Sequence, residues 1–132
     1  MNEREFEELV IESIAELPEY FRERMENITI HIENIPDENI LKNLGISSPC
    51  SLLGLYQGVP VTHRGIHYRN VLPDRILIYR KPILNKINDK SNRQEIKKEV
   101  KRVVLHEIGH YFGLSDEQLY TIEKNLHQKH KF

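Results

Sequence analysis

The chain has 132 residues, of which 39% are hydrophobic, enough for one domain with a single core. Its 19 Lys and Arg nearly cancel its 20 Asp and Glu, so the net charge of −1 provides no general attraction to nucleic acid or to an anionic membrane. The one cysteine, Cys50, excludes an internal disulfide, and no apolar run reaches the roughly 20 residues that span a bilayer. Without a signal-peptide pattern at the N-terminus, we expect a cytoplasmic protein with one domain over residues 1–132, of which 127–132 form a polar tail.

The first half of the chain alternates between helical and extended patterns. Apolar residues recur at helical spacing over residues 2–17, which predicts an N-terminal helix. Between residues 28 and 32, isoleucines alternate with polar residues, as is typical of a half-buried strand. A short helix is expected at residues 37–44, with Gly45 at its left-handed C-terminal cap.

Two further strands flank a long loop. Residues 52–56 form one candidate strand, and residues 75–79, with the sequence Arg-Ile-Leu-Ile-Tyr, form the clearest one in the chain. The residues between them, 59–74, have a loop-like composition. Because such a loop is long for a small domain, this segment is expected to form a functional rim.

The last third of the chain is helical. One helical turn is expected at residues 82–86, a long helix at about 93–112 that ends before Gly113, and a last helix at about 115–126. The long helix has an apolar stripe that we expect to be buried, made of Ile96, Val100, Val103, Val104, Ile108 and Tyr111. The order of elements predicts an α+β domain, in which a three- to four-stranded sheet packs with the N-terminal helix, the long helix and the C-terminal helix.

The long helix ends with the sequence HEIGHYFGLSD, which begins at His106. His106 and His110 are one turn apart along the helix and about 40° apart around its axis, so both imidazoles can converge on one zinc ion. Glu107 faces the same space, where it can accept a proton from a water whose pKa the metal lowers. Gly113 provides a turn after which the Asp116 carboxylate can return to the metal as a third ligand.

Asp116 has a second interpretation. Residues 115–118 also have the sequence of an ordinary helix start, where an acidic side chain in the first turn is favourable. In that case the third ligand would be Glu117, Glu123 or His127. The motif as a whole would also fit a structural helix whose histidines cap backbone groups.

The chain resembles a bacterial family of small zincin-like metallopeptidases with the pattern His-Glu-x-x-His-x-x-Gly-x-x-Asp. Four further blocks of that family occur in the same order, namely Leu17 to Glu19, Ile35 to Pro36, Leu53 to Gly58 and Leu72 to Ile76. The resemblance implies a zinc-dependent hydrolase of peptide bonds that acts on peptides or proteins. It implies His106, His110 and Asp116 as the zinc ligands and Glu107 as the general base.

The ligand spacing is also similar to that of the metzincin peptidases, which have a third histidine in place of Asp116. Those enzymes carry a methionine turn after the zinc-binding helix. Both methionines of this chain, Met1 and Met25, precede the helix. The resemblance therefore implies a minimal domain without the methionine turn, and a carboxylate ligand would make zinc a slightly weaker Lewis acid.

In zincins the substrate lies extended along an edge strand of the sheet, and residues 52–57 fit either that edge or a plain core strand. Four side chains could stabilise developing negative charge, and nothing in the sequence selects among Tyr56, His63, His67 and Tyr68. Cys50 is expected to be a small buried hydrophobic residue.

Two other functions fit the same pattern. A zincin scaffold could bind metal or a peptide without turnover, because a short chain can lack half of a deep cleft. A metal-dependent endoribonuclease is the other alternative, since a ribosomal-RNA-processing family also places two histidines four residues apart on a helix. Glu107 stands where that family has glycine, and the net charge of −1 gives no attraction to RNA. Nucleic acid and membranes are therefore not expected as partners, and no feature of the sequence sets an oligomeric state.

Overall fold

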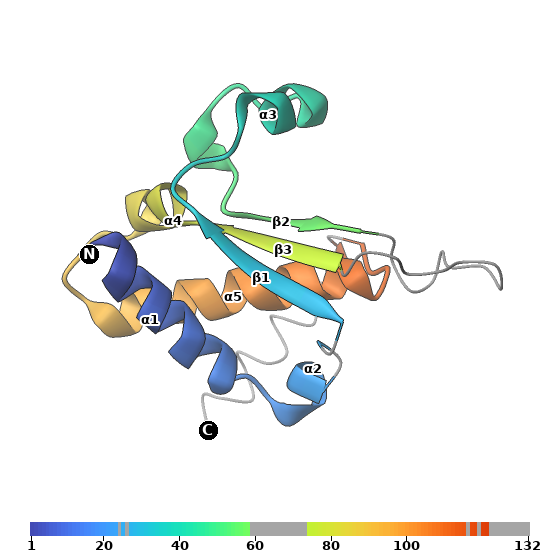
Figure 1. Ribbon diagram of the computed structural model, residues 1–132, viewed down its shortest axis with the longest axis horizontal. Coiled ribbons are helices and arrows are strands. Elements are labelled where there is room, and N and C mark those ends of the chain that lie inside the picture. The colour runs from blue at the N-terminus through green and yellow to red at the C-terminus, as the bar shows by residue number, and fades with distance from the viewer. Residues whose placement is uncertain (24, 26, 59–73, 116, 119, 122–132) are drawn as a thin grey trace, which may run out of the picture.

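The computed structural model (Figure 1) describes residues 1–23, 25, 27–58, 74–115, 117–118 and 120–121. The elements with defined bounds are α1 (Glu3–Ala15), α2 (Glu19–Glu23), β1 (Ile28–Glu33), α3 (Glu38–Leu44), the 3-10 helix η1 (Pro49–Ser51), β2 (Gly54–Gln57), β3 (Asp74–Tyr79), α4 (Arg80–Lys86) and α5 (Arg93–Tyr111). This arrangement confirms the α+β class, with a small sheet, an N-terminal helix and a long helix that carries the histidines.

The main helices begin and end where the sequence provides caps. The Asn2 side chain accepts the N–H of Glu5 at 2.8 Å before α1, and the Asn92 side chain accepts the N–H of Glu95 at 3.1 Å before α5. Helix α3 ends at Gly45, whose φ of 70° is a conformation that glycine adopts without strain. None of the helices in the described part of the chain is long and apolar enough to cross a membrane.

The sheet has the strand order β1-β3-β2, with β3 in the centre. Strand β1 runs parallel to β3 and places Ile30 opposite Ile76. Strand β2 runs antiparallel to β3 and places Tyr56 opposite the same Ile76. Of the two interpretations of residues 52–57, the structure therefore supports the edge strand, within the sheet that the described residues form.

Helices α1 and α5 pack against each other, and α5 also lies against β2 and β3 (Figure 1). The apolar stripe predicted for the long helix is buried throughout. It meets the side chains of α1 and β3 in a core that includes Phe6, Leu9, Val10, Ile76, Ile78, Ile96, Val100, Val104 and Ile108. This packing fixes how α5 is rotated about its axis beside the sheet, and therefore the direction of the side chains that border the stripe at the edge of β2.

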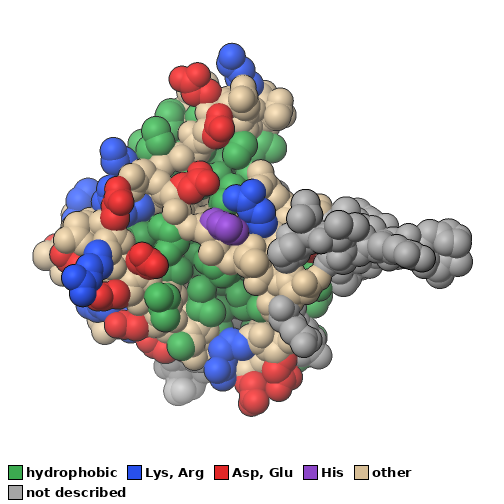
Figure 2. Space-filling view, viewed as in Figure 1, with side chains coloured by type: hydrophobic (Ala, Val, Ile, Leu, Met, Phe, Trp, Pro, Cys, Tyr) green, Lys and Arg blue, Asp and Glu red, His purple; other side chains and the backbone are tan. Residues whose placement is uncertain are grey.

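Ion pairs join α1 to α5 at the surface. Glu12 pairs with Arg93 at 2.7 Å, and Glu16 pairs with Lys97 at 2.7 Å and with Lys101 at 2.9 Å. The hydrogen bonds from Lys101 and Lys97 lower the pKa of the Glu16 carboxyl to about 2. On the face of the molecule in Figure 2, acidic and basic side chains are likewise interspersed, so charge of neither sign gathers into one broad area there.

Cys50 is exposed, so the prediction of a buried side chain is wrong. The residue lies in η1, a single turn that connects α3 to β2 and buries none of its own residues. A turn this short has no apolar face to pack against the core, and its side chains therefore remain at the surface.

Candidate active site

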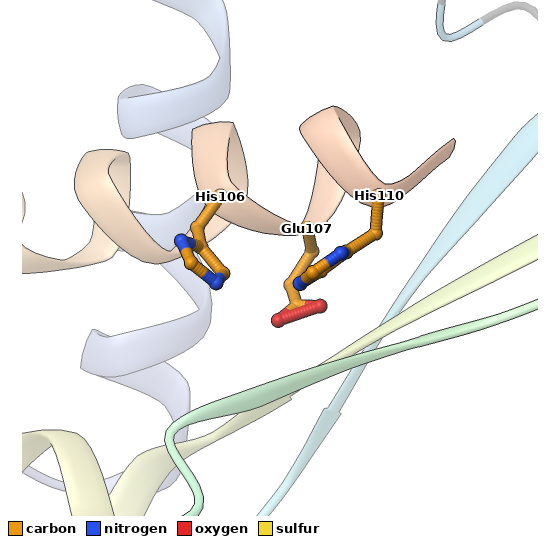
Figure 3. Close-up of side chains that lie close together, drawn as sticks. All are labelled: His106, Glu107 and His110. Atoms are coloured by element: carbon orange, nitrogen blue, oxygen red, sulfur yellow. The ribbon is translucent and has the colours of Figure 1, made fainter. Parts of the chain in front are cut away.

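The last two turns of α5 bring His106, Glu107 and His110 together, with their side chains on one side of the helix (Figure 3). Their nitrogen and oxygen ligand atoms all lie within 4.8 Å of one another. The two imidazole rings have centroids 4.9 Å apart and planes inclined by 82°. Both histidines are half-buried, whereas Glu107 is only 8% exposed. The structure thus places these three residues as their spacing in the sequence predicts.

The chemistry of this cluster fits a zinc ion. Imidazole nitrogens and carboxylate oxygens are ordinary zinc donors, each about 2 Å from the metal, so donors of one site lie up to about 4 Å apart. The donor atoms here lie within 4.8 Å of one another, and small side-chain rotations would bring the two imidazoles onto one ion. His106 and His110 could therefore hold the metal from α5, with the Glu107 carboxylate beside them.

Glu107 is hydrogen bonded to the edge strand. Its Oε2 accepts the backbone N–H of Tyr56 at 2.9 Å. The N–H of Tyr79 donates to the carbonyl of Leu53, so Leu53 faces β3 with its backbone groups. In an antiparallel pair every second residue does so, and the residues between them, Gly54 and Tyr56, therefore turn their backbone groups away from β3. The Glu107 carboxylate thus caps a donor that an edge strand would otherwise present to solvent or to another strand. Because a carboxylate accepts several hydrogen bonds, this contact does not prevent Glu107 from accepting a proton.

The close approach of β2 to α5 requires glycine at position 54. A Cβ atom built on Gly54 would lie 2.6 Å from Val103 Cγ1 and 3.5 Å from Glu107 Cγ. Non-bonded carbon atoms normally come no closer than about 3.5 Å. A larger residue would therefore push β2 away from α5, and with it the N–H that Glu107 accepts.

The side chain of Tyr56 is anchored at the start of β3. Its hydroxyl donates to Asp74 Oδ2 at 2.6 Å, and its ring lies 6.0 Å from that of Tyr111 between centroids. Asp74 is only 2% exposed. A Cβ atom on Gly58 would lie 2.5 Å from the Asp74 carboxylate, so the chain leaving β2 packs directly against this pair. Tyr56, one of the four residues considered as donors to a developing negative charge, therefore has its hydroxyl engaged with Asp74.

Ser115 and Gln118, which stand on either side of Asp116 in the sequence, form a reciprocal cap. Ser115 Oγ accepts the N–H of Gln118 at 3.2 Å, and Gln118 Oε1 accepts the N–H of Ser115 at 2.9 Å. This capping box confirms that a helix starts here, and residues 117, 118, 120 and 121 are helical. Asp116 itself lies outside the described residues, so its role as a ligand stays a prediction.

Other predicted site residues also lie outside the described part of the chain. They are His63, His67 and Tyr68 in the expected rim, and Glu123 and His127 among the alternative ligands. Glu117, the remaining alternative, is described and is exposed.

A cavity of about 610 Å³ lies where α5 passes the edge of β2. His106, Glu107 and His110 line it together with four leucines from separate segments, namely Leu44, Leu52, Leu55 and Leu114. Leu44, on α3, is 48% exposed. Among the described residues that line the cavity there is no lysine or arginine. In the described part of the chain, the two histidines and Glu107 therefore adjoin leucine side chains and no lysine or arginine within the cavity.

Comparison with known proteins identifies the family. A sequence model that represents zincin-like metallopeptidases matches residues 25–126. The matched segment begins before β1 and includes the whole described sheet and helix α5. No curated protein matches the chain.

Proposed function

The chain belongs to the zincin-like metallopeptidase family, and we propose that it hydrolyses peptide bonds with zinc as its cofactor. The observation that carries the proposal is the cluster of His106, Glu107 and His110 beside the edge of β2. His106 and His110 would hold the ion, with Asp116 as the proposed third ligand. When bound, zinc polarises a peptide carbonyl and lowers the pKa of water to about 7.

Glu107 is the proposed general base. In hydrolysis, the oxygen of a water molecule forms a bond to the carbonyl carbon, and the bond from that carbon to the amide nitrogen breaks. Glu107 accepts a proton from the water and passes it to the leaving amine. Its 8% exposure and its hydrogen bond to the Tyr56 N–H support this role, because both restrict the carboxylate to the space beside the two histidines.

The proposed substrate is a peptide segment that lies extended along β2. An edge strand offers backbone groups to such a segment, and in β2 these are the N–H and carbonyl of Gly54 and the carbonyl of Tyr56, whose N–H is bonded to Glu107. The leucines that line the cavity favour apolar side chains near the cleaved bond, because these would bury apolar surface against them, whereas an acidic side chain would find no lysine or arginine among the described lining residues.

The first test is the metal content of purified protein variants. The wild type should retain about one zinc ion per chain, and His106→Ala and His110→Ala should each lose it. His31→Ala is a matched control, because His31 is an exposed histidine on β1 whose Nε2 lies 3.0 Å from Thr29 Oγ1. Full metal retention in both α5 variants would contradict the site.

The second test is cleavage of a peptide library by zinc-loaded protein. Glu107→Gln should keep the zinc and the fold but lose cleavage, because an amide cannot accept the proton from water. Cleavage at the wild-type rate by this variant would rule out the proposed base. Zinc binding without cleavage of any peptide by the wild type would instead favour the non-catalytic scaffold.

A further inference from the structure

We propose that Asp74 and Tyr56 are positioning residues for Glu107, an inference that rests on the proposed role of Glu107 as general base. Two hydrogen bonds connect the three residues. The Tyr56 hydroxyl donates to Asp74 at 2.6 Å, and the Tyr56 backbone N–H donates to Glu107 at 2.9 Å. Tyr56 thus connects the two carboxylates, because its side chain binds Asp74 and its backbone binds Glu107.

The first step of the argument is that Glu107 needs a partner to fix it. A glutamate side chain rotates about three bonds, and a misplacement of about 1 Å in a reacting group can cost up to about 100-fold in rate. One partner that helps to fix this carboxylate is the backbone N–H of Tyr56, which no substitution at position 56 removes apart from proline. The position of Glu107 therefore depends on where β2 lies.

The second step is that β2 needs an anchor of its own. In the described sheet it is a strand of four residues, Gly54–Gln57, that pairs only with β3. The Tyr56 side chain supplies a second attachment, because its hydroxyl is bonded to a carboxylate that is only 2% exposed. Gly58 packs against the same carboxylate at the end of the strand. Removing the hydroxyl should therefore let the Tyr56 N–H move relative to Glu107.

Amide hydrogen exchange measured by NMR on zinc-loaded protein tests both bonds without requiring activity. The amide of residue 56 should exchange about tenfold faster in Glu107→Ala than in the wild type, and Glu107→Gln should stay close to the wild type because it keeps an acceptor oxygen. Leu55, whose N–H points toward β3 in this register, serves as the internal reference. Unchanged protection of residue 56 in Glu107→Ala would overturn the proposal.

The same measurement separates Asp74 from a purely structural role. Tyr56→Phe and Asp74→Ala should each accelerate exchange at residue 56 severalfold, while Asp74→Asn, which still offers an acceptor oxygen, should restore protection. Tyr79→Phe is the matched control, because it makes the same chemical change on β3 at a hydroxyl that has no hydrogen-bond partner among the described residues. Equal exchange in Tyr56→Phe and Tyr79→Phe would show that the Asp74 bond does not position the base.

Kinetics with a cleaved peptide gives the second readout. Tyr56→Phe should lower kcat about tenfold with KM within about twofold and with full zinc content, since the lost positioning affects the reacting base and not ground-state binding. Tyr79→Phe should keep the wild-type kcat. A wild-type kcat in Tyr56→Phe would overturn the proposal even if the protein were less stable. If the wild type cleaves no peptide, the proposed function fails, and the exchange measurements alone decide whether Asp74 and Tyr56 hold the Glu107 carboxylate.

Discussion

Gly54→Ala should separate β2 from α5 by a small and calculable amount. The new Cβ would lie 2.6 Å from Val103 Cγ1, which is about 0.9 Å closer than the roughly 3.5 Å of an ordinary carbon contact. Such overpacking costs about 1–3 kcal/mol, and the loss of glycine flexibility in the unfolded chain offsets about 0.4–1 kcal/mol of it. We therefore expect a net loss of about 1–2 kcal/mol in the free energy of unfolding.

The same displacement should affect Glu107. The Tyr56 N–H lies 2.9 Å from Glu107 Oε2, and a shift of about 0.9 Å would take this distance beyond the range of an effective hydrogen bond. Gly54→Ala should therefore lower kcat and accelerate amide exchange at Tyr56, while zinc content stays unchanged. The histidines lie on α5 and do not depend on the position of β2.

Val103→Ala provides the matched rescue. This substitution removes the nearest atom that the new Cβ would meet, while the Leu77 carbonyl oxygen stays at 3.1 Å. Alone it should cost about 2 kcal/mol through lost burial of methyl groups. In the double variant the Gly54→Ala strain is relieved, so the total loss should be at least about 1 kcal/mol smaller than the sum of the single losses. Urea denaturation with equal m-values measures each term. Additive losses would refute the steric argument, as would a cost below about 0.5 kcal/mol for Gly54→Ala alone.

Three further predictions concern other residues. If Asp116 is a zinc ligand, Asp116→Ala should weaken zinc affinity by orders of magnitude and Asp116→His should restore it; if it is only a helix-start acid, the alanine variant should bind metal normally and lose about 0.5–1 kcal/mol of stability. Tyr79→Phe should leave the free energy of unfolding unchanged or raise it by about 1 kcal/mol, because its buried hydroxyl has no partner among the described residues; a loss above about 1 kcal/mol in urea denaturation would contradict this. Since Lys101 and Lys97 lower the pKa of Glu16 from 4.5 to about 2, the stability from this contact is complete above about pH 4.5 and is lost as the pH falls toward 2. Glu16→Gln should reduce that loss in acid denaturation at low salt, and an unchanged pH dependence would show that the contact contributes nothing.

The histidine cluster could be predicted from the sequence because it lies within one helix. Helical periodicity alone sets the angle between His106 and His110, and the buried apolar stripe that borders the pair on α5 shows which way the two side chains project. The capping residues fix the ends of this helix and of α1 in the same local manner. Predictions of this kind succeed because they depend on neighbours within a few positions of the chain.

The hydrogen bonds that connect Glu107 to Tyr56 and Tyr56 to Asp74 could not be predicted in the same way. The bond from the Tyr56 N–H crosses 51 positions of the sequence and depends on how closely β2 approaches α5. The sequence indicates this hydrogen bond only indirectly, because a glycine and an aspartate at the first positions of two strands, Gly54 and Asp74, are common without any functional role. An acidic residue that opens a strand as apolar as β3 is the clearer sign, since a carboxylate buried there needs a hydrogen-bond partner. Tyr56 is that partner, and it joins two blocks of the family resemblance that lie far apart in sequence.

The hydrogen bond from the Tyr56 N–H to Glu107 also affects how the proposed substrate would bind, because it occupies a donor on the free edge of β2. If a peptide pairs with β2 while Glu107 keeps the Tyr56 N–H, only the Gly54 groups and the Tyr56 carbonyl remain to pair with it. So few backbone hydrogen bonds, each with a net contribution of about 1 kcal/mol, cannot by themselves hold a peptide tightly. Affinity would then depend on side chains that enter the leucine-lined cavity, where burial of a large apolar side chain contributes about 1.5–3 kcal/mol. Selection among peptides should accordingly follow the apolar residues beside the cleaved bond more than the length of the segment.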